Sequence, residues 1–204
     1  MTGRRARITA VVLLPLALAA ACDSSDPAPP PATTTSSTPA TTTSVNPATL
    51  APRVTNPLKA DRFTADPCSS LTSAQQQQFG IIRTDVDDDR EGVGCRYGYP
   101  NWTPTASAVE YATKVSIGLS YRYAEHARGS YDYWQPTDVD GYPAVGYTAT
   151  KPEDPGPDLC SFAIGLADTL FFSVTAEDKS GVARCSTAKD LASAVLANIK
   201  ADQK

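Results

Sequence analysis

The chain has 204 residues, of which 41% are hydrophobic and 20% charged, and its formal net charge is −4. This length allows one globular domain plus an unstructured segment and excludes a large multidomain protein. The acidic balance disfavours a nucleic-acid partner, because binding to a phosphate backbone requires a basic surface. A single His and a single Met leave little material for imidazole catalysis or a histidine-rich metal site. We therefore expect no cofactor, no metal ion and no nucleic-acid partner.

The first segment of the chain has the layout of a signal peptide. Arg4, Arg5 and Arg7 are followed by residues 8–21, which are apolar or small apart from one threonine. This run of about 14 residues is shorter than the roughly 20 that a transmembrane helix needs. We predict that residues 1–21 are a signal peptide that is removed.

The run ends in Ala19-Ala20-Ala21-Cys22, which resembles the lipobox of bacterial lipoproteins, whose cysteine is lipidated before cleavage makes it the first residue. The chain has five cysteines, and lipidation of Cys22 leaves an even number that can pair completely. A diacylglycerol and palmitate anchor would hold the protein firmly, since each buried methylene contributes about 0.8 kcal/mol. We therefore expect a lipid-anchored protein on the extracytoplasmic face of the cell membrane. An ordinary secretory signal cleaved after the alanines is the alternative.

The segment after Cys22 is rich in Ser, Thr, Pro and Ala as far as Ala60. Its few large apolar side chains cannot offset a backbone entropy cost of about 1 to 2 kcal/mol per residue. We therefore predict that residues 22–60 are the lipidated cysteine followed by a disordered tether. The globular domain is predicted at residues 61–204.

The domain is predicted to open with a short helix. Thr72 is followed three residues later by Gln75, which is the capping-box pattern, and Phe79-Gly80 supplies a glycine stop.

Five strands are predicted after this helix. Residues 93–99 form the first, and residues 112–123 form the clearest, because apolar and polar residues alternate along them. Residues 144–150 form another strand, and residues 159–166 and 170–176 form an antiparallel hairpin.

The last predicted element is an amphipathic helix capped by Ser186 or Thr187. Its apolar residues recur at helical spacing and would cover a sheet: Leu191, Ala192, Val195, Leu196 and Ile199. Strands grouped between a short N-terminal helix and this C-terminal helix favour the α+β class, with an antiparallel β-sheet stapled by disulfides.

The remaining cysteines are Cys68, Cys95, Cys160 and Cys185. Their wide spacing does not fit a structural zinc site, whereas an exported chain meets an oxidising compartment. Pairing of neighbours, Cys68 with Cys95 and Cys160 with Cys185, closes the shortest loops and would contribute about 3 to 4 kcal/mol per bridge. Crossed pairings and free thiols are the alternatives.

Several short motifs together resemble an actinobacterial lipoprotein family whose domain is described only as of unknown function. They are Asp66-Pro67-Cys68-Ser69-Ser70-Leu71-Thr72, Gly94-Cys95, Gly141-Tyr142-Pro143-Ala144 and the helix that follows Cys185. The resemblance covers nearly all of the domain, although Tyr97 stands where the family commonly has Trp. It implies paired cysteines and an extracytoplasmic domain, and it carries over no catalytic residue.

Aromatic residues are concentrated in the middle of the chain, where all nine Tyr and both Trp lie between Tyr97 and Tyr147. Tyr131, Tyr133 and Trp134 stand among small and polar residues in a loop-like segment, so they are candidates to line a groove for a glycan, a peptide or a small apolar ligand. The interpretation that we favour is that these rings cover one side of the sheet and shield the hairpin. His126, in a polar stretch, is expected to be a surface residue.

No residue pattern predicts catalysis, because no nucleophile elbow or comparable frame surrounds a serine. We therefore expect a non-enzymatic binding or interaction module of the cell envelope, with an envelope protein, a glycan or a small apolar ligand as partner. A small-ligand carrier or sensor with an aromatic groove is the alternative. A cell-wall hydrolase acting through two carboxylates is the third.

Overall fold

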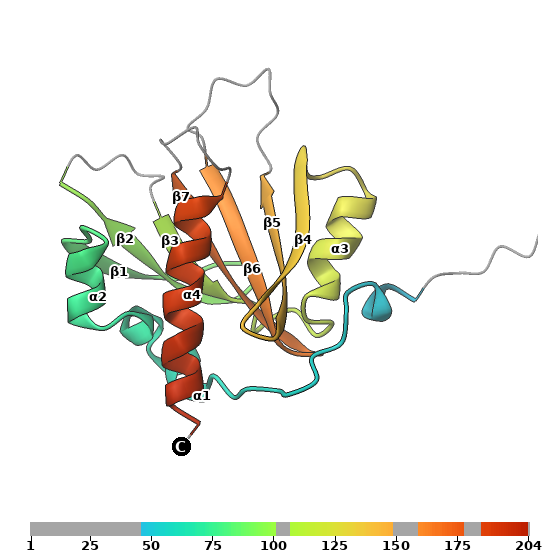
Figure 1. Cartoon of the computed structure of the whole chain (residues 1–204), viewed down its shortest axis with the longest axis horizontal. Helices are drawn as coiled ribbons and strands as arrows, with labels where there is room; N and C mark the ends of the chain where they lie inside the picture. The colour runs from blue at the N-terminus through green and yellow to red at the C-terminus, as the bar shows by residue number, and fades with distance from the viewer. Residues whose placement is uncertain (1–45, 101–106, 149–158, 178–184, 204) are drawn as a thin grey trace, which may run out of the picture. The chain divides into compact units, whose positions relative to one another are not determined.

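The computed structural model describes residues 46–100, 107–148, 159–177 and 185–203. Helical elements and strands follow one another along the chain (Figure 1). The helical elements are η1 (Pro47–Thr49), α1 (Asp61–Ala65), η2 (Pro67–Ser70), α2 (Ser73–Gln78), α3 (Ser120–Ala127) and α4 (Ser186–Ala201). The strands are β1 (Arg83–Asp88), β2 (Val93–Gly98), β3 (Ser107–Tyr111), β4 (Tyr133–Val139), β5 (Tyr142–Thr148), β6 (Leu159–Ala167) and β7 (Leu170–Glu177).

The strands form one seven-stranded sheet in the order β1-β2-β3-β7-β6-β5-β4, and every neighbouring pair is antiparallel. The predicted α+β class with an antiparallel sheet is therefore confirmed. The strands predicted at 93–99, 159–166 and 170–176 correspond to β2, β6 and β7. The strand predicted at 144–150 corresponds to β5, although its last two residues lie outside the described part of the chain.

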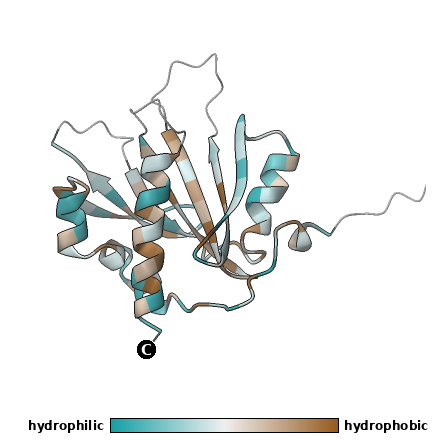
Figure 2. Cartoon of the chain, viewed as in Figure 1, coloured by the Kyte–Doolittle hydropathy of each residue, from teal (hydrophilic) through white to brown (hydrophobic). Residues whose placement is uncertain are grey.

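The main hydrophobic core lies on the face of the sheet that α4 crosses (Figure 1). The sheet contributes alternate residues such as Phe162 and Ile164 of β6, since successive side chains of a strand point to opposite faces. The α4 residues in this core include all the apolar positions predicted for the last helix, and Ala188 in addition. Figure 2 shows the hydrophobic residues of β6 and α4 against the more hydrophilic α2 and β4.

A local capping rule explains where α2 begins but not where α4 begins. At the start of α2, the Thr72 side chain accepts a hydrogen bond from the Gln75 amide and the Gln75 side chain accepts one from the Thr72 amide, which confirms the predicted capping box. The residue before α4 is Cys185, in a left-handed conformation with φ of 68° and without a side-chain cap, rather than the predicted Ser186 or Thr187.

The prediction of a strand at residues 112–123 is wrong. Residues 112–119 form turns, and residues from Ser120 onward form α3. Gly118 has a φ of 51°, which interrupts an extended chain, and its carbonyl accepts a hydrogen bond from the Tyr121 amide at 3.0 Å. The alternation was misleading because Arg122, placed on the polar face of the predicted strand, is buried on the helix.

The boundary predicted at residue 61 also requires correction, because residues 46–60 pack on the domain. The Val54 amide donates to Asp168 Oδ1 at 3.0 Å, and the Leu58 amide donates to the Leu166 carbonyl at 2.8 Å. Val54 and Ala60 are buried in the main core. The predicted disordered tether is therefore too long at its C-terminal end, while residues 22–45 lie outside the described structure.

Candidate functional site

The predicted signal peptide and Cys22 lie outside the described residues. Among the helices in the described part of the chain, none is long and apolar enough to cross a membrane. The lipid anchor therefore stays a prediction.

The four remaining cysteines form two disulfides. Cys68 of η2 is bonded to Cys95 of β2, and Cys160 of β6 is bonded to Cys185 at the start of α4, with Cα–Cα distances of 5.0 Å in both. The predicted pairing of neighbours is confirmed. One bridge fixes the N-terminal helical turn to the sheet, and the other fixes the start of α4 to it.

An aromatic patch lies between α3 and β4, on the face of the sheet opposite the main core. Trp134 stacks parallel to His126 with ring centroids 4.4 Å apart and to Tyr131 with centroids 5.7 Å apart. Tyr123 meets Trp134 edge-on at 5.0 Å. We call Tyr123, His126, Tyr131 and Trp134 the aromatic patch. His126 is exposed, as predicted, and the other three side chains are half-buried.

The three aromatic residues predicted to share one loop do not lie on one face of the sheet. Tyr133 and Trp134 begin β4, so their side chains point to opposite faces of the sheet. Tyr133 packs against the core on the α4 face, while Tyr131 and Trp134 pack against a second hydrophobic cluster that includes Tyr147 and Phe171. The loop-like placement of Tyr133 and Trp134 is therefore wrong, and their use as a ligand site stays a prediction.

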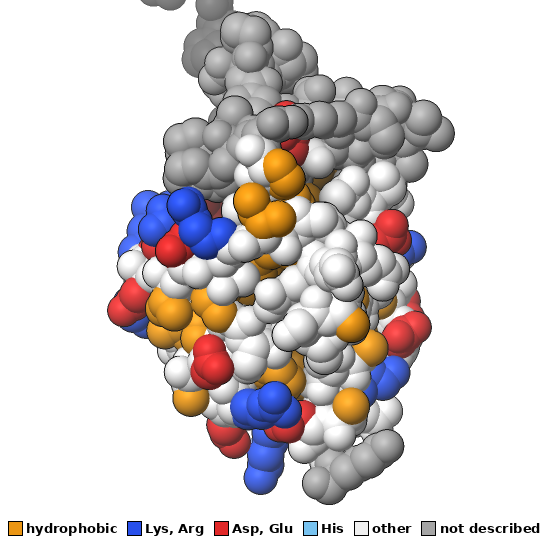
Figure 3. Space-filling model, turned by 90° about the vertical axis from the view of Figure 1, so that its left-hand side faces the viewer, with side chains coloured by type: hydrophobic (Ala, Val, Ile, Leu, Met, Phe, Trp, Pro, Cys, Tyr) orange, Lys and Arg blue, Asp and Glu red, His pale blue; other side chains and the backbone are white. Residues whose placement is uncertain are grey.

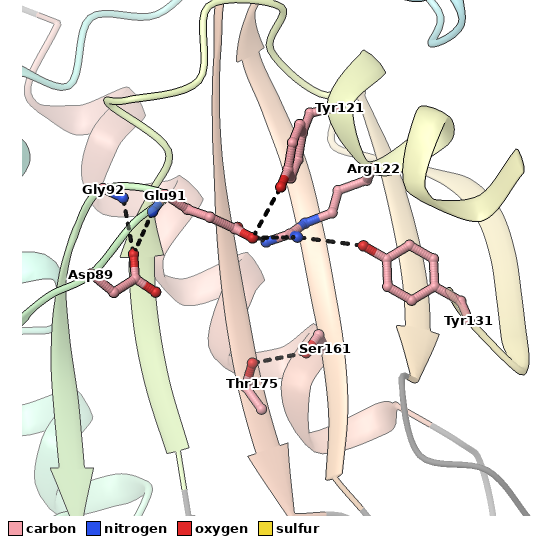
Figure 4. A network of polar contacts seen from close by, with 8 residues as sticks. All are labelled: Asp89, Glu91, Gly92, Tyr121, Arg122, Tyr131, Ser161 and Thr175. Atoms are coloured by element: carbon pink, nitrogen blue, oxygen red, sulfur yellow. Dashed lines mark hydrogen bonds and ion pairs between the residues drawn. The ribbon is translucent and has the colours of Figure 1, made fainter. Parts of the chain in front are cut away.

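A buried ion pair between Arg122 and Glu91 is linked to the aromatic patch through the Tyr131 hydroxyl. The side chains of Arg122 and Glu91 point toward one another across the sheet, with Tyr121 and Tyr131 beside them (Figure 4). Arg122 Nη2 lies 2.5 Å from Glu91 Oε2, and Nη1 lies 3.3 Å from Oε1. Arg122 Nη1 also donates to the Tyr131 hydroxyl at 3.4 Å. The guanidinium thus connects the β1–β2 turn to one ring of the patch.

Arg122 stays charged in this setting. Burial would lower the pKa of Arg122, but electrostatic interactions with Tyr147, Tyr131 and Glu91 raise it above its ordinary value. The guanidinium carbon also lies 5.3 Å from the Tyr147 ring and 5.1 Å from the Phe171 ring, within range of cation–π attraction. Arg122 Nε is buried without a hydrogen-bond partner.

A third carboxyl group lies near this ion pair on β3. Burial, together with the charges of Asp89 and Glu91, raises the pKa of Glu110 to about 7. Burial would also raise the pKa of Asp89, but hydrogen bonds from the backbone amides of Glu91 and Gly92 lower it on balance. Glu110 Oε1 is buried without a hydrogen-bond partner. Glu110 is therefore the acid in this region that takes up a proton near neutral pH.

Further along the same face, the Ser161 and Thr175 hydroxyls of β6 and β7 are hydrogen-bonded at 2.8 Å (Figure 4). This side of the sheet therefore combines hydroxyl, carboxyl and guanidinium groups with aromatic rings. In the described part of the chain, no group of three or more His, Cys, Asp or Glu side chains could hold a metal ion.

The sequence analysis missed Glu91, Glu110 and Arg122. A charged residue is usually exposed, so nothing in the local pattern marked them as buried. One available signal was the dense tyrosine content around Arg122, because aromatic rings and hydroxyls can compensate a buried guanidinium.

Comparison with known proteins shows the family of the chain and no activity. No match was found among curated proteins or among solved structures. A family model described as "Protein of unknown function (DUF3558)" matches residues 17–198, which include nearly the whole domain and both disulfides. The chain therefore belongs to the DUF3558 family of proteins of unknown function.

Proposed function

We propose that this protein is a lipid-anchored, non-enzymatic interaction module on the extracytoplasmic face of the cell membrane, and that it binds an envelope protein through the aromatic patch. The anchor would be the lipid on Cys22, and the disulfides fit an oxidising location. Aromatic side chains are enriched at protein interfaces because they provide a large contact area with few rotatable bonds.

The observation that carries this proposal is the stacking within the aromatic patch. The rings of His126 and Tyr131 lie parallel to the Trp134 ring, with centroids 4.4 and 5.7 Å from its centroid. The stacked rings therefore occupy the space in which a ligand would have to insert between them. A ligand would therefore contact the outer surface of the patch. The Tyr131 hydroxyl is held by Arg122, so the surface is organised before a partner arrives.

The two alternatives receive less support from the geometry. A small-ligand carrier would need a cavity lined by Tyr131 and Trp134, whereas these rings stack on one another. One crevice in the described part of the chain is lined by other residues, 48–49, 51–54, 119–120 and 167–168. A hydrolase would need two available carboxylates, but both oxygens of Glu91 are engaged by Arg122.

The proposal is tested by photo-crosslinking in intact cells, with a photoreactive amino acid at Asp132. Asp132 is exposed and lies between Tyr131 and Trp134 of the aromatic patch. The matched control carries the same group at Asp190, which is exposed on α4. We expect a discrete protein adduct from position 132 that is absent from position 190 and is lost when Trp134→Ala is added.

Three results would contradict the proposal. Identical adducts from both positions would indicate contact without specificity. An adduct that persists with Trp134→Ala would show that the aromatic patch is not part of the interface. An adduct that disappears on digestion of the cell wall would assign the patch to a glycan instead.

A further inference from the structure

The outer edge of the sheet at β1 leaves backbone groups available for pairing with another strand. β1 is an end strand that pairs only with β2. The Asp89 amide donates to the Gly92 carbonyl at 3.0 Å, and hydrogen-bonded and non-hydrogen-bonded pairs alternate along an antiparallel ladder. Thr84, Val86 and Asp88 therefore turn their backbone N–H and C=O groups away from β2.

Apolar side chains also reach the surface here. Val86 is 65% exposed and Ile82, just before β1, is 68% exposed, and these are the exposed large hydrophobic residues of the described chain. Figure 3 views the side of the molecule on which α2 and β1 lie, where hydrophobic side chains appear between acidic and basic ones. An exposed edge strand with apolar side chains is a template for another strand.

The opposite edge of the sheet is blocked. β4 and β5 are joined by the two residues Asp140 and Gly141, so Val139 pairs by hydrogen bonds with Tyr142. The same alternation turns Pro136 outward, where proline offers no N–H to an incoming strand. Because this sheet carries a protecting proline on β4 and none on β1, the β1 edge stands out as the one open to pairing.

The charges on β1 indicate which strand would fit. Asp85 and Asp87 lie on the face opposite Val86, because side chains alternate. Their ion pairs with Arg83 (3.0 Å) and Arg96 (3.6 Å) are solvent-exposed and contribute little stability. An incoming strand with a basic residue opposite each aspartate and an apolar residue opposite Val86 would match both faces.

A second copy of this chain would match poorly. Antiparallel pairing of two β1 strands about Val86 would place Asp85 of one copy opposite Asp87 of the other. Like charges directly opposite each other destabilise a strand pair.

We propose that the outer edge of β1 is a docking site for an extended segment of a partner protein in which lysine or arginine alternates with apolar residues. The segment would add to the sheet beside β1, with backbone hydrogen bonds to Thr84, Val86 and Asp88. This inference is independent of the aromatic patch.

The test uses the full chain and a fluorescent probe peptide of alternating lysine and valine, about seven residues long as in a typical strand. We expect saturable binding by fluorescence anisotropy that weakens as salt is added. Hydrogen exchange at the amides of Thr84, Val86 and Asp88 should slow by about tenfold or more, while the amides of Asp85 and Asp87, already bonded to β2, should not change.

Two variants separate backbone pairing from charge. Val86→Pro removes one outward N–H and should weaken binding by about tenfold or more, whereas Val86→Thr keeps the N–H and should bind normally. The double variant Asp85→Asn with Asp87→Asn should weaken binding and reduce its salt dependence. A peptide methylated on its valine amides, with the same charge, should not bind.

Several outcomes would overturn the proposal. They are equal binding by Val86→Pro and the parent chain, equal binding of the methylated peptide, and slowed exchange at amides outside β1. Failure of the parent chain to bind the peptide at all would also overturn it. Concentration-dependent dimerisation that Val86→Pro abolishes would assign the edge to a second copy instead.

Discussion

Arg122 of α3 and Glu91 of the β1–β2 turn form a buried ion pair across the sheet, with side chains only 9% and 11% exposed. Two guanidinium nitrogens face the two carboxylate oxygens, a geometry in which an ion pair is strong and directional. The pair fixes α3 over the sheet, and through the Tyr131 hydroxyl it also fixes the aromatic patch.

Removing one partner of this pair should be much more costly than removing both. Glu91→Leu leaves the Arg122 guanidinium buried without its counter-charge, which typically costs about 3 to 5 kcal/mol of unfolding free energy. The double variant Glu91→Leu with Arg122→Met should recover most of that loss. Urea denaturation measures both, and equal stability of the single and double variants would contradict the coupling.

Much of the sheet and both disulfides could be predicted because local patterns determine them. The hairpin of β6 and β7 follows from two apolar runs around a short turn, and α2 follows from the Thr72 capping box. The pairing of neighbouring cysteines follows from loop length. Each of these features depends on residues close together in the sequence.

The remaining features depend on contacts between distant parts of the chain. Residues 112–123 alternate like a strand, yet the left-handed Gly118 and the burial of Arg122 beside Glu91 make residues from Ser120 onward a helix. Residues 46–60 lack a core of their own and are ordered by contacts with residues such as Asp168, which lies over a hundred positions away. No local signal reports such partners.

Glu110 should make stability depend on pH. Its pKa is raised from 4.5 to about 7 in the folded protein, mainly by burial. Its contribution is therefore fully present below pH 4.5 and is lost as pH rises through about 7, because the unfolded chain ionises first. Glu110→Gln should raise the melting temperature relative to the parent chain at pH 8 and change it little at pH 4. The same difference at both pH values would contradict this assignment.

Gly118 should tolerate alanine less well than Gly141. Both have positive φ, 51° and 86°, so alanine at either site costs about 1 to 2 kcal/mol of backbone strain. A Cβ at Gly118 would also lie 2.6 Å from the Asp168 carbonyl oxygen, whereas nothing lies within 4 Å at Gly141. Thermal unfolding should show a clearly larger loss for Gly118→Ala. Equal losses of stability in the two variants would contradict this prediction, because the β6–β7 turn would then move away from the added methyl group without an energetic cost.

Each disulfide should contribute similarly to stability. The bridged cysteines are 27 and 25 positions apart, and loops of this size contribute about 3 to 4 kcal/mol on the chain-entropy model. Paired replacement by alanine, Cys68 with Cys95 or Cys160 with Cys185, should lower the unfolding free energy by comparable amounts. A pair whose removal changes nothing would show that its bridge is dispensable.

The central claim is that the protein works at the membrane, held by a lipid on Cys22. The most direct measurement is mass spectrometry of the mature N-terminus from native membranes. We expect the chain to begin at Cys22 and to carry diacylglycerol, and Cys22→Ala should move the protein from the detergent phase to the soluble fraction. A mature chain that begins with an unmodified Cys22 would contradict the claim.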